Sequence, residues 1–596
     1  MKDKWINNME YKNENRICQN CKKDFMIESE DFLFYKKMKV PVPTWCPVCR
    51  YKRRIIWRNV RYLTRGKDEI TGKEIFTGIP NESGLKIYDL HYWNSDKWEA
   101  LDYGFDYDFA ETFFKQIKEL FYKVPFNSVS KQRNINSDYS NQCDDMKNSY
   151  LCFNAGFCED SAYSCNVHSI KNCFDLTSCY NSEFCYEDVR VEKSYHTVGS
   201  TMCESCIDVF FSKNCVGCNN CFGCVNLRNS SYLIFNVQYT KDEYFNKINS
   251  FNLNTWEGFN DLRKKSENFW TKFPIKYMLG SRNYNSTGED IKECKNVNDC
   301  YIVQKGENLK YSQDLFFGGA SDSYDYTCWG LNASQLYECM ICGEFVDRLK
   351  FCFDCWPSCQ ELEYCMNMRR SKNCFACVGL KDKQYCVFNK QYTKDEYFTL
   401  INRIKENIDE NPYIDKHGNI YKYGEFFPIE ISPFAYNETI LNDQFLSNKE
   451  KAEKEGYIWR NHDQKIYNIT INANNLISPI NQVDENITKE IIKCEQCGNA
   501  YRIIFEEFQF LKKINLPLPR LCSNCRFIRR QEFMVPPLIN ESQCMCNGEY
   551  SLNSQYKNTQ KHNIHGNERC KSIFKTAYDP EKEIIYCEKC YQQEVY

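Results

Sequence analysis

Histidine is scarce in this 596-residue sequence, with seven residues in all, and the common catalytic motifs are missing. There is no GxxxxGK[ST] phosphate loop, no GxGxxG after a strand pattern, no HExxH and no GxSxG. The carboxylates between residues 102 and 111 are spread among aromatic residues and fit a helix entry better than a glycosidase pair. These absences favour a protein that is not an enzyme, without deciding the question.

Long apolar runs are also missing. The N-terminal segment has no apolar stretch typical of a secretory signal, and no run approaches the 18 or so apolar residues of a membrane span. We therefore expect a cytoplasmic protein without a membrane partner. In a reducing compartment, the 38 cysteines should be free or bound to metal. A disulfide framework is the alternative if the chain is exported by an unconventional route.

The net charge of -3 gives no global basic field of the kind that marks a dedicated nucleic-acid binder. Aromatic residues make up 16% of the chain, so apolar area for burial is ample and disorder is not expected. The length predicts about three to five domains.

Two segments with the same cysteine spacing lie near the two ends of the chain. In each, a CxxC pair is followed by 24 residues and a second CxxC pair. Because four thiolates complete a tetrahedral shell that excludes water and substrate, we predict two structural zinc sites. The predicted ligands are Cys18, Cys21, Cys46 and Cys49 at the first site and Cys494, Cys497, Cys522 and Cys525 at the second.

The two segments are copies of one module. Shifting the first by 476 residues aligns Cys18–Arg54 with Cys494–Arg530 without a gap, and fifteen positions are identical. The CxxC pair, the aromatic Phe25, the run Glu30–Tyr35 and CPxCR with its basic tail together resemble the family described as probable zinc ribbon. This resemblance implies a small metal-stabilised module at each end and carries no activity.

A third zinc site is predicted in the C-terminal segment, where the cysteine spacing is less regular. The predicted ligands are Cys546, Cys570, Cys587 and Cys590. Cys544 offers a further thiol, and His562 or His565 is an alternative ligand. The segment Tyr88–Trp93 stands in the corresponding place after the first ribbon, and we interpret it as a degenerate copy that has lost its metal.

The other 25 cysteines lie between Cys143 and Cys386. Short phrases of Lys, Asn or Ser and Cys recur there at steps of 24, 22 and 20 residues, with related phrases halfway between. A period near 22 with a half-step near 11 predicts the coils of a parallel β-solenoid, with one residue in two facing inward.

This cysteine-rich block is duplicated. Cys221–Phe245 and Cys374–Phe398 align at an offset of 153, and sixteen of 25 positions are identical. Thr240 and Thr393 are each followed three residues later by Glu, which predicts a capping box and a helix that closes each solenoid.

The role of the solenoid cysteines stays open between packing, metal binding and redox chemistry. Small apolar side chains suit the inward positions of a narrow coil, so the thiols could serve only for packing. Alternatively, the run Cys215-x2-Cys218-x2-Cys221-x2-Cys224 could hold an iron–sulfur cluster or another zinc, although its spacing matches a ferredoxin only loosely. Isolated CxxC pairs such as Cys339/Cys342 could act in redox chemistry. We rank packing first.

Arginines follow each ribbon and are interleaved with aromatic residues. Such surfaces can track phosphates and stack on bases, so nucleic-acid contact is a candidate role. The candidate contact residues are Arg50, Lys52, Arg53, Arg54, Arg58, Arg526, Arg529 and Arg530. The alternatives are a protein partner and internal packing.

The sequence thus predicts a multidomain, mostly β protein, in which terminal zinc ribbons flank two cysteine-rich parallel β-solenoid modules with short helices. The predicted segments are a zinc ribbon (1–66), a degenerate ribbon (67–100), a linking helix (101–139), a first solenoid (140–250), a helical insert (251–293), a second solenoid (294–405), a connector (406–485), a zinc ribbon (486–535) and a C-terminal zinc-binding unit (536–596).

Phrases such as Ser95–Trp98, Leu101–Gly104, Cys221–Leu227 and Ile585–Tyr591 also resemble zinc-ribbon and cysteine-repeat proteins of candidate-phyla bacteria, a family that brings no established activity. Three functions remain. The first is a non-catalytic scaffold that binds zinc and presents a rigid surface to a protein or glycan. The second is an RNA- or DNA-associated protein, and the third is a redox or iron–sulfur protein.

Overall fold

The computed structural model describes residues 11–462 and 466–596, and the chain groups into two compact units. Unit 1 contains the N-terminal ribbon and the second solenoid, within residues 1–128, 278–460 and 537–539. Unit 2 contains the first solenoid and the C-terminal ribbon, within residues 129–277, 461–536 and 540–596. Each ribbon therefore belongs to the same unit as the solenoid from the other half of the sequence.

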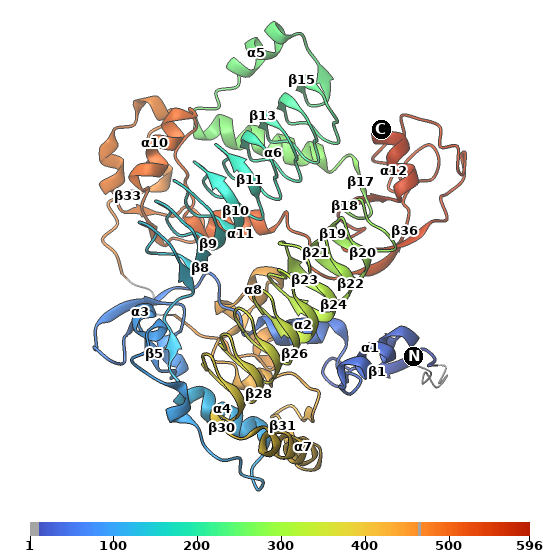
Figure 1. Ribbon diagram of the computed structural model, residues 1–596. Helices are drawn as coiled ribbons and strands as arrows, with labels where there is room; N and C mark the ends of the chain where they lie inside the picture. The colour runs from blue at the N-terminus through green and yellow to red at the C-terminus, as the bar shows by residue number, and fades with distance from the viewer. Residues whose placement is uncertain (1–10, 463–465) are drawn as a thin grey trace. The chain divides into compact units, whose positions relative to one another are not determined.

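The first solenoid is a ladder of parallel strands that pair in chain order, as predicted (Figure 1). Its strands are β7 (Lys131–Gln132), β8 (Asn141–Asp144), β9 (Phe153–Gly156), β10 (Cys165–Lys171), β11 (Tyr180–Glu183), β12 (Tyr195–Val198), β13 (Ile207–Phe210), β14 (Asn219–Phe222) and β15 (Ser231–Ile234), closed by the antiparallel β16 (Val237–Gln238). The mostly β, double-solenoid fold class is thereby confirmed.

The second solenoid has the same form (Figure 1). Its main path runs through β18 (Gly280–Ser281), β19 (Gly288–Lys292), β21 (Cys300–Gln304), β23 (Gln313–Leu315), β24 (Ser321–Thr327), β25 (Ser334–Met340), β26 (Asp347–Lys350), β27 (Gln360–Glu363), β28 (Lys372–Phe375), β29 (Gln384–Val387) and β30 (Lys390–Gln391). Two strands, β20 (Lys295–Asn298) and β22 (Glu307–Lys310), pair beside this path.

The predicted coil length was wrong. Residues pair with partners 12 positions later in the first solenoid, as Phe153 does with Cys165, and 11 to 14 positions later in the second. Every third residue has a positive φ, as at Asn166, Ser169 and Asn172. The coil is therefore built mainly from triplets, with one residue in three facing inward. The recurrence of 24 residues noted in the sequence spans two coils.

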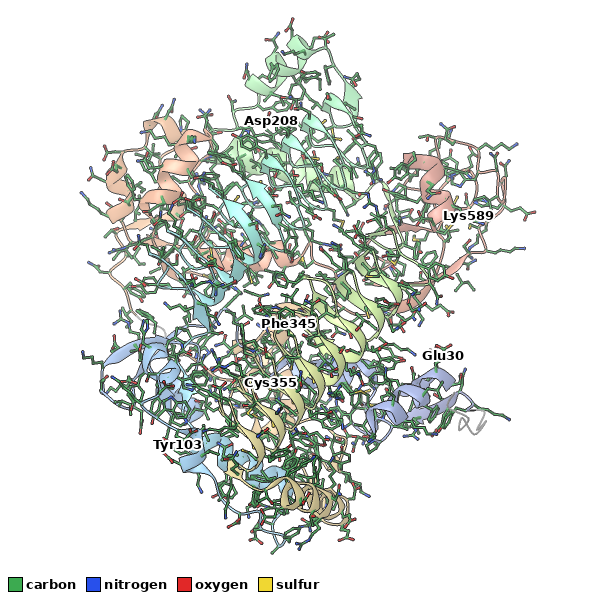
Figure 2. The ribbon with its side chains drawn as sticks, in the orientation of Figure 1. Glu30, Tyr103, Asp208, Phe345, Cys355 and Lys589 are labelled. Carbon is green, nitrogen blue, oxygen red and sulfur yellow. The ribbon has the colours of Figure 1, made fainter. Side chains whose placement is uncertain are left out.

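The triplet explains the composition of the solenoids. Asn, Asp and Gly tolerate positive φ better than most other residues, and they are frequent at that position. The residue that follows points inward and is buried, as at Cys173, Leu176 and Cys179. In the second solenoid, Cys355 follows Asp354, whose φ is 50°, and Cys355 is fully buried (Figure 2).

Inward Cys and Ser side chains also bond to the backbone of the coil. The Cys143 thiol donates to the carbonyl oxygens of Asn141 and Cys152 at 3.2 and 3.3 Å, and the Ser149 hydroxyl donates to Lys147 and Cys158 at 3.1 and 3.3 Å. The side chains are small enough for a narrow interior, and their donors add a second hydrogen bond to carbonyls that backbone amides already reach, as the Lys147 amide reaches Cys158 at 2.9 Å.

The predicted capping boxes are confirmed. Thr240 caps α5 (Lys241–Asn249) and Thr393 caps α7 (Lys394–Glu410), and in both the N3 glutamate bonds back to the cap. The helices pack against β15 and β29, the last parallel strands of their solenoids. They cover part of the strand edge that would otherwise stay open at that end.

The remaining elements surround the solenoids. In unit 1 they are β1 (Glu14–Ile17), β2 (Asp24–Ile27), α1 (Ser29–Met38), α2 (Pro47–Ile55), β3 (Thr64–Lys67), β4 (Glu74–Thr77), β5 (Ile87–Tyr88), α3 (Leu90–Asn94), α4 (Phe113–Lys123), β6 (Phe126–Asn127), β31 (Tyr413–Ile414), β32 (Ile420–Tyr421), α8 (Ile440–Gln444) and α9 (Lys449–Lys454). In unit 2 they are α6 (Trp256–Trp270), β17 (Pro274–Lys276), β33 (Ile471–Asn472), β34 (Ile492–Lys493), β35 (Ala500–Tyr501), α10 (Phe505–Lys513), α11 (Ser523–Gln531), β36 (Asn540–Gln543), β37 (Ile573–Thr576), β38 (Ile584–Tyr586) and α12 (Glu588–Val595).

Short 3-10 turns occur at residues 81–83, 100–103, 429–431, 436–438, 473–475, 480–482 and 485–489. Among the described residues, no helix has both the length and the apolar character needed to cross a membrane.

Candidate metal centres

The N-terminal ribbon brings its four predicted ligands together. The donor atoms of Cys18, Cys21, Cys46 and Cys49 all lie within 4.8 Å of one another. A tight turn after Cys18 carries the first pair, and Cys46 is the N-cap of α2, so the second pair opens that helix. The Cys46 amide donates to the Cys18 sulfur at 3.2 Å. Such a contact favours the thiolate that a metal requires.

The C-terminal ribbon repeats this geometry. Cys494, Cys497, Cys522 and Cys525 form a second group within the same limit. Cys522 is the N-cap of α11, and its amide donates to the Cys494 sulfur at 3.3 Å. Equivalent residues of the two ribbons therefore occupy equivalent places.

The sulfur separations fit a tetrahedral metal site. The Sγ–Sγ distance is 3.8 Å between Cys21 and Cys46 in the first ribbon. In the second ribbon it is 3.9 Å between Cys494 and Cys525 and 3.7 Å between Cys497 and Cys522. A tetrahedron with zinc–sulfur bonds of about 2.3 Å has edges of about 3.8 Å, whereas a disulfide bond is about 2.05 Å long. No disulfide bond joins cysteines within the described residues. The groups can hold a metal ion, and their residues fit zinc.

The C-terminal unit contains two groups of ligands rather than the one predicted. The first comprises Cys544, Cys570, Cys587 and Cys590, and the second comprises Cys546, His562, His565 and Cys590. The prediction of Cys546 in the all-cysteine set is corrected, because the amide of Cys587 contacts the Cys544 sulfur, at 3.2 Å, whereas the Cys546 sulfur lies 3.2 Å from His562 Nδ1.

The segment of unit 1 that we predicted to be a degenerate copy has a similar local frame without the thiols. Strand β5 pairs in parallel with β6 and leads into α3, just as β38 pairs with β17 and leads into α12. Asp89 is the N-cap of α3 and accepts a bond from the His91 amide at 2.9 Å, whereas Cys587 is the N-cap of α12. A carboxylate cap thus stands where the other copy has a metal ligand.

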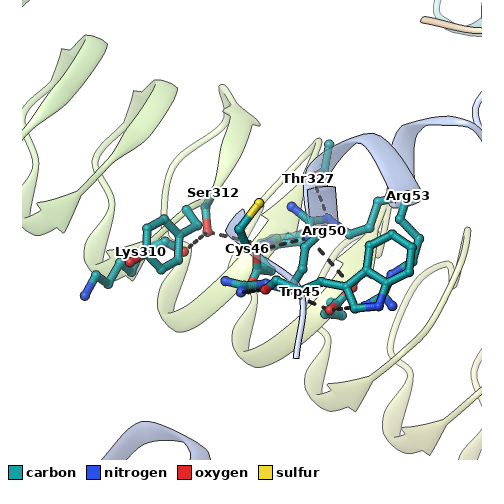
Figure 3. A network of polar contacts seen from close by, with 12 residues as sticks. Trp45, Cys46, Arg50, Arg53, Lys310, Ser312 and Thr327 are labelled. Atoms are coloured by element: carbon teal, nitrogen blue, oxygen red, sulfur yellow. Dashed lines mark hydrogen bonds and ion pairs between the residues drawn. The ribbon is translucent and has the colours of Figure 1, made fainter. Parts of the chain in front are cut away.

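The arginines after the first ribbon point into the second solenoid (Figure 3). The Asp325 carboxylate forms ion pairs with the guanidinium groups of Arg50, at 2.9 Å, and Arg54, at 3.1 Å. The Arg53 guanidinium forms ion pairs with Glu338 at 2.7 Å and with Glu425 at 2.6 Å. All these side chains are at most 7% exposed. The ribbon helix is therefore anchored to the solenoid by buried charge pairs.

The second ribbon is anchored to the first solenoid in the same way. The Asp175 carboxylate forms ion pairs with the guanidinium groups of Arg526, at 2.9 Å, and Arg530, at 2.7 Å. Arg529 forms an ion pair with Glu187. Burial alone would raise the pKa of Glu187, but Arg529 and Arg263 hold it below its usual range. The carboxylate is therefore ionised in its buried pair.

These contacts remove the basis for nucleic-acid contact by the arginines. Arg50, Arg53, Arg54, Arg58, Arg526 and Arg530 are at most 3% exposed, and Arg529 is engaged with Glu187. Lys52 is partly exposed and lies 3.6 Å from Glu455. Internal packing, the alternative interpretation, accounts for these residues instead.

The acidic partners were not recognised from the sequence. A signal was present, since Asp175-Leu176-Thr177 and Asp325-Tyr326-Thr327 share an Asp-x-Thr pattern. The two threonines accept from Arg530 Nε at 3.1 Å and from Arg54 Nε at 3.3 Å, so the pattern marks the docking position in both solenoids.

The solenoid cysteines do not converge on a metal. None of the 25 belongs to a group of three or more potential ligands within 4.8 Å among the described residues. Cys215, Cys218, Cys221 and Cys224 occupy four successive inward positions, so their spacing follows the triplet of the coil. Burial raises the pKa of Cys152 to about 12, which keeps that thiol protonated at neutral pH. The geometry supports packing and gives the cluster alternative no support.

Comparisons with known proteins add no family. No family model and no curated protein matches the chain. Among solved structures, the chain is similar to one described as a "putative acetyltransferase" from Desulfovibrio desulfuricans G20, at 12% identity over 46% of this chain and 84% of that one, with a TM-score of 0.09. A score this low supports no conclusion about fold or function.

Proposed function

We propose that this chain is a non-catalytic binding scaffold whose zinc ions are structural. The proposal depends on one observation: the arginines that follow each ribbon form buried ion pairs with a solenoid. Four sulfur ligands close each ribbon site to substrate, and the helix that begins at the third ligand leads directly to arginines buried in a solenoid. The metal would thus fix the helix that joins the ribbon to the solenoid.

The first solenoid offers a surface suited to a glycan. A cavity of about 420 Å³ is lined by side chains of its early coils and by residues at the start of α10. The lining includes Asn136, Asn148 and Asp160, whose side chains form a ladder with bonds of 3.1 and 3.0 Å, and the rings of Tyr139 and Tyr150. Amide and carboxylate groups can bond to sugar hydroxyls, and tyrosine faces can contact the apolar face of a sugar ring.

The chemistry supports a cytoplasmic location as part of this proposal. The 38 cysteines, thirteen of them in the candidate metal-binding segments, form no disulfide bond within the described residues, which suits a reducing compartment.

The binding proposal can be tested by titrating the full chain with neutral oligosaccharides in a calorimeter. Asn148→Ala and Tyr150→Ala should weaken binding at least tenfold. Asn308→Ala is the matched control, because Asn308 belongs to a similar ladder of the second solenoid, with bonds of 3.1 and 2.9 Å, and does not line the cavity. Equal affinity of all three variants for the oligosaccharides, or binding only to a protein partner, would reject the proposal that the cavity binds a glycan.

The structural role of the metal has a separate test. Cys497→Ala should release one zinc per chain and expose the α11 amides to hydrogen exchange, because the ribbon helix loses its metal. A variant that retains every zinc ion, or that loses one without any change in exchange, would reject the structural role.

A further inference from the structure

Seven potential ligands of the C-terminal unit form two tetrahedral sets with one member in common. The sets are Cys544, Cys570, Cys587 with Cys590, and Cys546, His562, His565 with Cys590. Cys590 lies near the start of α12, on the first turn after the Cys587 cap, and it is fully buried. Its neighbour Lys589 marks this helix in Figure 2.

Distances across both sets fit coordination to metal. In the first set, the Cys570 and Cys587 sulfurs are 3.9 Å apart, close to the edge of about 3.8 Å expected around zinc. In the second, His565 Nε2 lies 3.2 Å from the Cys590 sulfur. This separation is within a few tenths of an ångström of a nitrogen–sulfur edge around zinc, which is about 3.6 Å.

The two histidines are oriented as metal ligands commonly are. His562 directs Nδ1 to the Cys546 sulfur and bonds through Nε2 to Glu594 at 2.8 Å, and both side chains are fully buried. His565 directs Nε2 to the Cys590 sulfur and bonds through Nδ1 to the Glu568 carbonyl at 2.7 Å. An acceptor on the outer nitrogen fixes the tautomer and leaves the inner nitrogen free to bind a metal.

The remaining contacts favour thiolates at these positions. The Cys546 sulfur accepts from the Gly548 amide at 3.4 Å and from the Asn558 side chain at 3.2 Å. The Cys587 sulfur accepts from the Cys590 amide at 3.5 Å. Each donor lies within the C-terminal unit, so the site is built by this segment alone.

We propose that the C-terminal unit binds two zinc ions bridged by the thiolate of Cys590. One ion takes four sulfur ligands and the other takes two sulfurs and two imidazoles, both sets that suit zinc. Sharing one thiolate lowers the excess negative charge, because five thiolates and two divalent ions sum to -1, against -2 for one ion bound by four thiolates. With the two ribbons, the full chain then carries four zinc ions.

The proposal rests on the structural zinc proposed above, and counting metal ions separates the two. Native mass spectrometry of the full chain purified with zinc should show four ions. X-ray absorption at the zinc edge should show a zinc–zinc distance of about 3.8 Å, which follows from two zinc–sulfur bonds of about 2.3 Å and a near-tetrahedral angle at the shared sulfur.

Variants assign the ions to their ligands. His565→Ala and Cys570→Ala each disrupt one set and should lower the count to three, whereas Cys590→Ala disrupts both and should lower it to two. Cys203→Ala, an inward solenoid cysteine, is the control and should retain four. Cys497→Ala should remove a ribbon ion whether or not the bridge exists.

A wild-type count of three, with no zinc–zinc distance in the absorption spectrum, would overturn the bridged pair while leaving the ribbon sites intact. An unchanged count in His565→Ala would do the same. The absorption measurement uses the unaltered chain, so it decides the question even if the Cys590 variant fails to fold.

Discussion

Cysteine has two roles in this chain, and the surroundings of each residue decide which one it takes. At the candidate metal sites, several sulfurs meet and receive amide bonds, as Cys18 does from the Cys46 amide. In the solenoids, inward thiols donate to nearby backbone carbonyls, as Cys143 does. The residue type is the same, but hydrogen bonds from the Cys46 and Cys49 thiols lower the pKa of Cys18, whereas burial raises the pKa of Cys143 and keeps its thiol protonated.

At this scale, the buried arginines should contribute strongly to stability. Arg54→Met removes the buried ion pair between Arg54 and Asp325 and leaves Asp325 Oδ1 without this partner. The free energy of opening the ribbon should therefore fall by about 3–5 kcal/mol. Native-state hydrogen exchange of α2 amides measures this energy. Lys52→Met is the control on the same helix, and its partly exposed pair should contribute about 1 kcal/mol or less. Equal effects of the two substitutions would contradict the anchoring role.

Asp314 should make the stability of the second solenoid depend on pH. Burial raises the pKa of Asp314 to about 6, although Arg58 opposes the shift. Because the folded pKa lies above the usual value, the stabilising contribution is present at low pH and is lost as the pH rises through 6. Between pH 5 and 7, the loss should be about 1 kcal/mol.

Asp314→Asn should remove this component. Hydrogen exchange of β23 amides in both proteins at pH 5 and pH 7 gives the difference, and the pH response of the zinc ligands cancels because both proteins share them. Parallel pH profiles of the variant and the wild type would show that Asp314 does not titrate in this range.

At the scale of the element, the triplet coil shows what the sequence could and could not reveal. The solenoid class and the helix caps at Thr240 and Thr393 followed from repeats and local capping chemistry. The coil length did not, because the inward positions accept Cys, Ser, Val and Leu alike and leave no simple alternation of apolar and polar residues.

The repeat length can be tested by changing the number of coils. Duplicating the 12 residues 145–156 adds one coil and keeps every triplet in register, so the chain should fold with unchanged thermal cooperativity. Duplicating only the six residues 145–150 keeps the triplets but displaces the next coil by half a turn, so the parallel pairs of the first solenoid cannot all form. Circular dichroism during heating distinguishes the two, and equal melting curves would contradict the 12-residue coil.

At the scale of the whole molecule, each unit joins parts that are far apart in sequence. Arg50 and Asp325 are 275 positions apart, and Arg530 and Asp175 are 355 apart. The cysteine spacing could be recognised from the sequence because the ligands within each CxxC pair are local. The docking of ribbon to solenoid was not predicted, because the Asp-x-Thr pattern is recognisable only when the two solenoids are compared, and nothing in it says which distant arginine it will meet.

This arrangement predicts the order in which the chain loosens when metal is removed. Zinc can supply on the order of 10 kcal/mol toward the folding of a small site, so a chelator should release the ribbons and the C-terminal unit first. The solenoid coils keep their ladder bonds and their buried thiols. Thirteen cysteines should then react with a thiol reagent, because 25 of the 38 lie within the solenoids.

Thiol counting after chelation, followed by counting in denaturant, measures this order. The remaining 25 thiols should react only when the solenoids unfold. Loss of the ribbons also exposes the carboxylates of Asp175 and Asp325 to water, so the solenoids should melt at a lower temperature than in the metal-bound chain. A single step in which all 38 thiols become reactive together would show that the solenoids have no stability without the metal-bound ribbons.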